Sequence, residues 1–365
     1  MKVAILGDTH FGARSDNLIF HGHFRKFYED IFFPVIKSRG IKQVIQLGDT
    51  FDRRKFVNYN TLHLSKSYFF NHFNSDLILH VFPGNHDIYF RDTLEVSAQK
   101  HNLTDLISKG HIKYYDKPST IDLGGMNLDI IPWICGSNKK DVFEFINGTQ
   151  SNICVGHFEI AGFEMEKGNI CNEGLDRAAL DKYEMVLSGH FHHRSSDGHI
   201  FYVGTPYEIT WGDYGDPKGF HILDTETRLM EFVENPYKIH HKLIYDEELE
   251  NLDTINNKDF SNLAETYVKV IVKQKTNPML FDMFLNKVNE GLPSDVSIIE
   301  DFNESYITDE DTVEGDTNDT GTLINKVIDT VETNLDKETL KNVLREIYQE
   351  ALSFESLREV AIDNI

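Results

Sequence analysis

The sequence predicts an α/β protein with largely parallel strands, and three observations support this fold class. Short apolar segments alternate with helical patterns over the first 225 residues, which is typical of a parallel sheet covered by helices. A glycine turn and then a polar residue follow five of these segments. After residue 240 the pattern changes to strand, helix, strand. A chain of 365 residues accommodates one large domain and one or two small ones.

Six apolar segments of the large domain are expected to be strands. They are KVAIL (2–6), QVIQL (43–47), LILHVF (77–82), NICV (152–155), EMVL (184–187) and HIFYV (199–203). Between the first two, apolar side chains recur at helical spacing from Phe20 to Val35, and Gly40 supplies a stop. This spacing predicts an amphipathic helix.

The remaining elements define three further parts of the chain. A strand at 267–273, a helix at 278–292 and a strand at 295–301 predict a small α+β domain. Residues 300–321 contain nine acidic side chains and no basic one, which indicates a solvated linker. We therefore predict domains at 1–225 and 226–300, an acidic linker at 301–321, and a C-terminal element at 322–365.

The C-terminal element is expected to be a pair of short amphipathic helices. Their apolar positions are Leu323, Ile324, Val327, Ile328 and Val331, then Leu340, Val343, Leu344, Ile347, Tyr348 and Leu352. Two helices cannot bury so wide an apolar face by themselves. Either they dock on the rest of the chain or they bind a partner, and the long linker favours a partner.

The composition limits the compartment and the ligands. No apolar run approaches the length of about 18 residues that a membrane span needs, and three cysteines without CxxC spacing indicate a reducing cytoplasm. The net charge of −23 argues against a nucleic-acid partner. However, RRKF (53–56) and NKK (138–140) are basic islands, and bound divalent metals would offset several carboxylates.

Polar side chains follow five of the predicted strands. The sequences are LGD (6–8), LGD (47–49), PGN (83–85), VGH (155–157) and SGH (188–190). In open α/β sheets, ligands bind beyond the carboxyl ends of the strands. The last residues of these five sequences, Asp8, Asp49, Asn85, His157 and His190, are therefore expected to converge on one rim.

Two further histidines join this set because alternate residues of an extended segment face the same way. His10 accompanies Asp8 and His192 accompanies His190, whereas His193 points to the opposite face. Seven ligands exceed the needs of one ion but suit two ions that share Asp49. Mixed imidazole and oxygen ligands favour Mn²⁺, Fe²⁺ or Zn²⁺ over Ca²⁺ or Mg²⁺, and such an ion pair clamps an attacking water and phosphoryl oxygens.

The ordered motifs DTH, GDTFD, GNHD, GH and GHFH resemble the calcineurin-like metallophosphoesterase superfamily. The resemblance implies a sandwich of two mixed β-sheets flanked by helices. It also implies one ion held by Asp8, His10, Asp49 and His192, and a second held by Asp49, Asn85, His157 and His190. His86 matches the family's catalytic histidine, which protonates the leaving oxygen, and Asp87 would orient it. The alternative for His86 is that it only supports the loop.

Three features resemble SbcD/Mre-type DNA repair nucleases, most closely those of large tailed phages. They are GDTHFG (7–12), GTPYEITWGDYGDPKGF (204–220), and the small domain followed by a linker and helix pair. The resemblance implies a Mn²⁺-dependent 3′→5′ exonuclease and structure-dependent endonuclease in the host cytoplasm. Its small domain would cap the DNA site, and its C-terminal helices would dock an SMC-like ATPase. A phosphatase or small phosphodiesterase, and a scaffold that bridges DNA ends, are the alternatives.

Two surface predictions concern the region after Asp49. Some relatives carry a histidine where this chain has Asp52, so the role of Asp52 is open. Arg53 and Arg54 are expected either to contact the DNA backbone or to form a solvated face.

The helical region 57–73 contains Tyr68, Phe69, Phe70 and Phe73, more aromatics than one core-facing stripe needs. By resemblance it would form a two-fold dimer contact, and core packing is the alternative.

Overall fold

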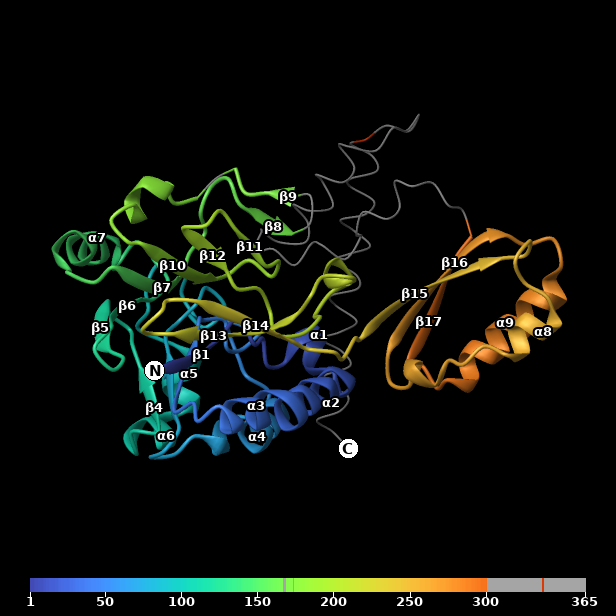
Figure 1. The fold of residues 1–365 in the computed structure, drawn as a ribbon, viewed down its shortest axis with the longest axis horizontal. Helices are drawn as coiled ribbons and strands as arrows, with labels where there is room; N and C mark the ends of the chain where they lie inside the picture. The colour runs from blue at the N-terminus through green and yellow to red at the C-terminus, as the bar shows by residue number, and fades with distance from the viewer. Residues whose placement is uncertain (167–168, 173, 301–336, 338–365) are drawn as a thin grey trace. The chain divides into compact units, whose positions relative to one another are not determined.

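The computed structural model describes residues 1–166, 169–172, 174–300 and 337, and Figure 1 shows their arrangement. The predicted acidic linker at 301–321 and, except for Lys337, the C-terminal element at 322–365 lie outside the described residues. No helix in the described ranges is long and apolar enough to cross a membrane. Cys135, Cys154 and Cys171 are buried.

The first sheet contains six strands in the order β14-β13-β1-β2-β3-β4. Four are parallel: β1 (Lys2–Leu6), β2 (Gln43–Gln46), β3 (Ile78–Val81) and β4 (Ile112–Tyr114). The other two, β13 (Gly219–Asp224) and β14 (Met230–Glu234), are antiparallel to their neighbours. This sheet includes the first three predicted strands in sequence order.

The second sheet also contains six strands, in the order β11-β12-β10-β7-β6-β5. Its parallel strands are β6 (Asn127–Ile131), β7 (Ile153–His157), β10 (Met185–Gly189) and β12 (Ile200–Tyr202). Its antiparallel edges are β5 (Ser119–Asp122) and β11 (Ser195–Ser196). The predicted α/β class and its two mixed sheets are confirmed.

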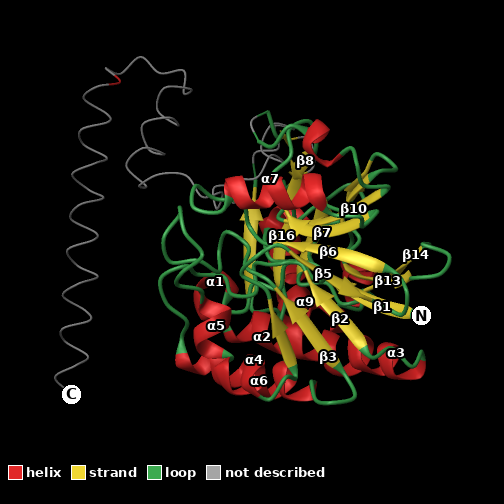
Figure 2. Ribbon diagram, turned by 90° about the vertical axis from the view of Figure 1, so that its left-hand side faces the viewer, coloured by secondary structure: helices red, strands yellow, loops and turns green. Residues whose placement is uncertain are grey.

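The apolar side chains of each strand face two different layers. In β1, Val3 and Ile5 enter the core between the sheets, together with Leu128 and Val155 of the second sheet. Alternate residues such as Leu6 enter a second core under the helices. Figure 2 shows α2 (Leu18–Phe27) and α4 (Tyr59–Tyr68) on the outer side of the first sheet and α7 (Lys139–Gly148) outside the second.

The predicted helix after β1 is present but is not uniform. It comprises α2, a π-helical turn at Tyr28–Phe32, and α3 (Phe33–Ser38). Pro34 lacks the N–H that a regular α-helix would donate four residues back, which accounts for the wider turn. The phenylalanines that predicted the helix are buried, with Phe24 and Phe27 fully inaccessible.

The helical region 57–73 forms α4 and a 3₁₀ turn at Phe70–His72. Its four clustered aromatics, Tyr68, Phe69, Phe70 and Phe73, are at most 1% exposed. The rings of Tyr68, Phe69 and Phe70 surround the ring of Phe11 at centroid distances of 5.4–5.8 Å. These aromatics belong to the core, so the argument for a dimer contact that rested on them is wrong.

Residues 240–299 contain three parallel strands and two helices. The strands are β15 (His240–Asp246), β16 (Tyr267–Gln274) and β17 (Asp295–Ile299), and the helices are α8 (Leu252–Asn256) and α9 (Pro278–Glu290). Asn277 caps α9 by accepting hydrogen bonds from Met279 and Leu280. The predicted strand, helix and strand are confirmed, and β15 was not predicted.

Shorter elements connect these layers. They are α1 (Ala13–Asp16), α5 (Ala98–Asn102), α6 (Thr104–Ser108), β8 (Glu164–Glu166), β9 (Asn169–Ile170), and 3₁₀ turns at Arg177–Leu180, Trp211–Asp213 and Ser261–Leu263. The Trp211–Asp213 turn precedes β13 in the chain.

Candidate metal centre

The seven predicted ligands lie where strands of both sheets end. Asp8 and His10 follow β1, Asp49 follows β2, and Asn85 follows β3 in the first sheet. His157 is the last residue of β7, and His190 and His192 follow β10 in the second sheet. The structure gathers these side chains into two adjacent groups, as the strand pattern predicted.

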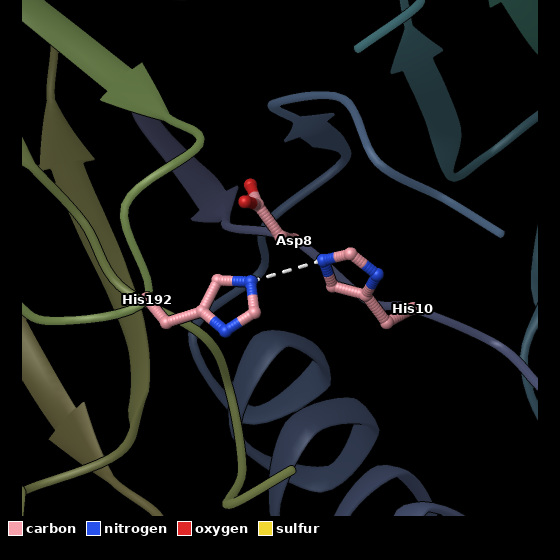
Figure 3. A group of neighbouring side chains, drawn as sticks. All are labelled: Asp8, His10 and His192. Carbon is pink, nitrogen blue, oxygen red and sulfur yellow. Dashed lines mark hydrogen bonds between the residues drawn. The ribbon is translucent and has the colours of Figure 1, made fainter. Parts of the chain in front are cut away.

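The first group consists of Asp8, His10 and His192, whose potential ligand atoms lie within 4.8 Å of one another. Figure 3 shows the two imidazoles facing each other, with Nε2 of His10 3.1 Å from Nε2 of His192. Asp8 Oδ1 is buried and has no hydrogen-bond partner among the described residues. A cation bound by the two nitrogens and this oxygen would satisfy all three atoms.

The second group consists of Asp49, His157 and His190, with the Asn85 side chain between the two histidines. Asn85 Oδ1 is 2.9 Å from His157 Nε2 and 3.0 Å from His190 Nδ1. His157 Nδ1 lies 2.7 Å from the Leu47 carbonyl, so the neutral ring donates there and its Nε2 is an acceptor. His157 Nε2 and Asn85 Oδ1 are then two acceptors 2.9 Å apart. They need a shared proton or a shared cation between them.

Asp49 lies between the two groups. Its Oδ2 is 3.2 Å from His157 Nε2 and 3.8 Å from His10 Nε2, while its Oδ1 accepts a hydrogen bond from the His86 amide at 2.8 Å. One oxygen therefore faces both groups and the other is fixed by the backbone. This geometry suits a carboxylate that bridges two ions.

The electrostatics of the site favour positive charge. Burial lowers the pKa of His157, but the carboxylates of Asp49 and Asp8 raise it to about 9. Burial likewise lowers the pKa of His10, while Asp52 and Asp49 raise it to about 9. The carboxylates thus stabilise one positive charge in each group, whereas burial lowers the pKa of His192 to about 3 and holds the pKa of His190 well below its usual value.

The backbone around the ligands is strained and closely packed. His10, Asp49 and His190 have φ values of 40°, 49° and 86°, in a region that non-glycine residues rarely adopt. Gly84 and Gly189 allow close approach, because a Cβ at Gly84 would lie 2.2 Å from Asp49 Oδ1 and one at Gly189 would lie 2.4 Å from Asp8 Oδ1. The chain tolerates this strain where it places ligands.

His86 lies beside the first group, with its ring centroid 5.0 Å from that of His10. Its Nδ1 is 2.6 Å from the main-chain carbonyl oxygen of Asp52, so Nδ1–H donates and Nε2 carries the lone pair or the transferable proton. The Asp52 side chain makes a second contact, with Oδ1 3.2 Å from His10 Nδ1. Asp52 therefore orients two histidines, a role that the sequence left open.

Asp87 does not make the contact that was expected of it. Its fully buried carboxylate accepts hydrogen bonds from the amides of Thr50 and Gly84 at 3.0 Å and from Gln99 Nε2 at 2.9 Å. No hydrogen bond between Asp87 and the His86 ring occurs among the described residues. Asp87 instead holds the loop after β2 against the loop after β3. The Asp52 carbonyl, and not Asp87, orients the His86 ring.

Two neighbouring residues complete the description. His193 Nδ1 is 3.0 Å from Asp216 Oδ1, and His193 belongs to neither ligand group of the described residues. The ring of Trp133 lies 5.3 Å from the His190 ring and 5.8 Å from the His157 ring. Sequence reasoning missed Trp133 because β6, which precedes it, was not recognised as a strand.

Comparisons with known proteins agree with this geometry. The model of the calcineurin-like phosphoesterase family matches residues 1–194. The chain is 34% identical over 356 residues to "Exonuclease subunit 1" of Enterobacteria phage T4, covering 96% of this chain and 99% of that protein. Among solved structures, an archaeal phosphodiesterase and a hypothetical protein of Thermus thermophilus are both 15% identical. They cover 64% and 65% of this chain and all of their own lengths, with TM-scores of 0.34 and 0.37, too low to support an argument.

Two of these findings identify the family. The family model covers more than half of the chain, and the phage relative covers nearly all of it. Members of this family are metal-dependent phosphoesterases that use two divalent ions. The chain belongs to the calcineurin-like phosphoesterase family.

Proposed function

We propose that this protein is a DNA exonuclease that hydrolyses phosphodiester bonds at a centre of two divalent ions. The observation that carries the proposal is the pair of adjacent ligand groups with Asp49 between them. The family membership supports phosphoester chemistry, and the phage relative, itself named an exonuclease subunit, favours DNA as the substrate.

Each ion would have four protein ligands. Asp8, His10, Asp49 and His192 would hold one ion, and Asp49, Asn85, His157 and His190 would hold the other. Mn²⁺ is the ion that we propose, because imidazole and oxygen ligands together suit a first-row metal. Mg²⁺ or another divalent ion is the alternative. When bound, two such ions would activate a water and neutralise the phosphoryl oxygens.

His86 would stabilise the transition state and protonate the leaving oxygen. Its Nδ1–H is fixed on the Asp52 carbonyl at 2.6 Å, which leaves Nε2 as the atom that moves the proton. The side chain is half-buried beside His10, so it is open to a substrate. Asp87 contributes by holding the two loops that carry Asp49 and His86.

The test uses purified protein with Mn²⁺, end-labelled duplex DNA, and a small aryl phosphodiester, beside His86→Ala. We expect DNA degradation that falls by a factor of about 10² to 10⁴ in the variant, the usual contribution of a general acid. Hydrolysis of the small ester with DNA left intact would favour the alternative, a phosphatase or small phosphodiesterase. DNA binding without any hydrolysis would favour a scaffold that bridges DNA ends.

The finer activities and partners follow from the same proposal. The phage relative is named a subunit, which supports a complex with a second protein. We propose an SMC-like ATPase that binds residues 322–365, gates 3′→5′ exonuclease and structure-dependent endonuclease activity, and acts in recombination and repair in the host cytoplasm. Deleting residues 322–365 should abolish co-purification with that ATPase and leave hydrolysis of short DNA intact. Loss of both would contradict this division of roles.

A homodimer through the region 57–73 remains part of the proposal on narrower grounds. Its buried aromatics are unavailable, but Tyr59 at the start of α4 is 89% exposed and the adjacent Phe56 is 56% exposed. Arg53 stacks on Phe56 at 4.9 Å and pairs with Asp16 at 3.6 Å. Sedimentation of the protein and of Tyr59→Glu should show a dimer that the variant weakens. A monomer at micromolar concentration would remove this contact.

A further inference from the structure

A buried lysine touches the metal-ligand loop from the opposite sheet. Lys218 is 2% exposed, and its Nζ donates to the main-chain carbonyl of His192 at 2.8 Å. The same nitrogen contacts Asp213 Oδ1 at 2.5 Å and Asp216 Oδ2 at 2.9 Å. Three acceptors thus fix a side chain that is otherwise among the most mobile in proteins.

The position of Lys218 in the fold explains why this contact matters. Lys218 directly precedes β13, which pairs with β1 through Ile5 and His221. It therefore starts from the strand next to the one that places Asp8 and His10. His192 follows β10 of the second sheet. The bond from Lys218 to His192 joins the two sheets at the first ligand group.

The two carboxylates around Lys218 are themselves anchored. Asp213 Oδ2 accepts hydrogen bonds from the amides of Ile209 and Thr210, both at 2.9 Å, and the Asp216 carboxylate contacts His193 Nδ1 at 3.0 Å. The His192 carbonyl also accepts from the Thr205 amide at 3.2 Å. Lys218 is therefore the charged centre of a rigid network that includes His192 and the next residue, His193.

We infer that Lys218 is a positioning residue that holds His192 at the distance from His10 and Asp8 at which these side chains bind one metal ion. The inference rests on the metal centre of the proposed function. A buried charge is costly unless it is fully paired. An apolar residue at position 218 would fill the space without holding the loop. Partners outside the ligand set typically change metal affinity by about 10- to 100-fold when they are removed.

The experiment measures Mn²⁺ binding by calorimetry and by electron paramagnetic resonance, without DNA, on metal-free full-length protein. His192→Ala and His190→Ala identify which of the two binding steps belongs to which group. We expect Lys218→Met to weaken the step that His192→Ala weakens by about tenfold, and to leave the other step within about twofold of the parent. Lys182→Met is the control for the loss of a lysine that donates to main-chain carbonyls, since the exposed Lys182 donates to those of Ile146 and Thr149 at 2.8 and 2.5 Å.

A second variant covers the case in which Lys218→Met does not fold. In the double variant Lys218→Met/Asp213→Asn, the carboxylate at position 213 is removed together with the lysine that neutralises it. The side-chain amide oxygen introduced there can still accept hydrogen bonds from the main-chain amides of Ile209 and Thr210. The double variant should also weaken the Mn²⁺-binding step that His192→Ala weakens, and leave the other step unchanged. Folded variants that bind both ions as the parent does would overturn the inference. A parent that binds fewer than two ions would instead overturn the proposed metal centre.

Discussion

Replacing Asp52 separates its side-chain contact with His10 from its main-chain contact with His86. The carboxylate lies 3.2 Å from His10 Nδ1, whereas the His86 ring is held by the Asp52 carbonyl, 2.6 Å away. Asp52→Ala removes only the first contact, and Asp52→Asn keeps a neutral acceptor in its place. The two variants therefore test how much the carboxylate contributes to metal binding without displacing His86.

The magnitude follows from the type of hydrogen bond that is lost. A hydrogen bond to a charged group contributes about 1.5–3 kcal/mol, and a neutral one about 0.5–1.5 kcal/mol. Asp52→Ala should thus cost about 2 kcal/mol of binding free energy and Asp52→Asn about 1 kcal/mol. At about 1.4 kcal/mol per factor of ten, these values correspond to about 30-fold and about fivefold weaker Mn²⁺ binding.

The assay titrates Mn²⁺ against the initial rate on end-labelled DNA, which gives an apparent metal constant and a maximal rate for each variant. We expect the apparent constant to rise in the order parent, Asp52→Asn, Asp52→Ala. The maximal rate at saturating Mn²⁺ should stay within about threefold of the parent, since His86 keeps its main-chain partner. A maximal rate that falls as steeply as in His86→Ala would refute this separation of roles.

Three further predictions concern other buried groups. Burial lowers the pKa of His80 from 6.5 to about 4, so only the unfolded chain takes up a proton between these pH values; stability should fall by about 3 kcal/mol from pH 6.5 to 4, and urea unfolding of His80→Gln should show a shallower fall. Asp87→Ala leaves several buried N–H groups without an acceptor and should cost about 3 kcal/mol in thermal unfolding; an unchanged melting temperature would contradict the bonding described. Gly189→Ala places a Cβ 2.4 Å from Asp8 Oδ1 and should weaken Mn²⁺ binding, whereas Gly148→Ala, with no atom within 4 Å, should leave it unchanged.

The convergence of the candidate ligands could be predicted because it depends on local order along the chain. Each ligand follows a short apolar strand, and alternation along the chain pairs His10 with Asp8 and His192 with His190. The helix after β1 was equally visible, since Phe20, Phe24 and Phe27 recur at helical spacing. These signals survive in the sequence because they depend on periods of two and 3.6 residues.

Strands at or near the edges of sheets were harder to predict. β5 and β6 pair with each other, and β13 reaches β1 across more than 200 residues of chain. Only the β13–β1 pairing depends on a partner far away in sequence, because β5 and β6 form a local antiparallel hairpin. For both, strand propensity varies with the side-chain contacts of each position. The dimer prediction from the aromatics of 68–73 failed for a related reason. These side chains are numerous because they form a core around Phe11, and not because they form an exposed surface.

The contacts that hold the ligands in place are mutual, which explains why no motif reveals them. Asp8 is a member of the first group, and its Oδ2 accepts a hydrogen bond from the amide of His190, a residue of the second group. Asp49 Oδ1 likewise accepts a hydrogen bond from the amide of His86. Asp8 therefore supports the strained turn at His190, whose φ is positive, and Asp49 supports the loop that carries His86. Replacing either carboxylate by alanine removes a ligand and an anchor together, so its effect on metal binding must exceed that of a ligand such as Asn85, whose side chain accepts no main-chain hydrogen bond among the described residues.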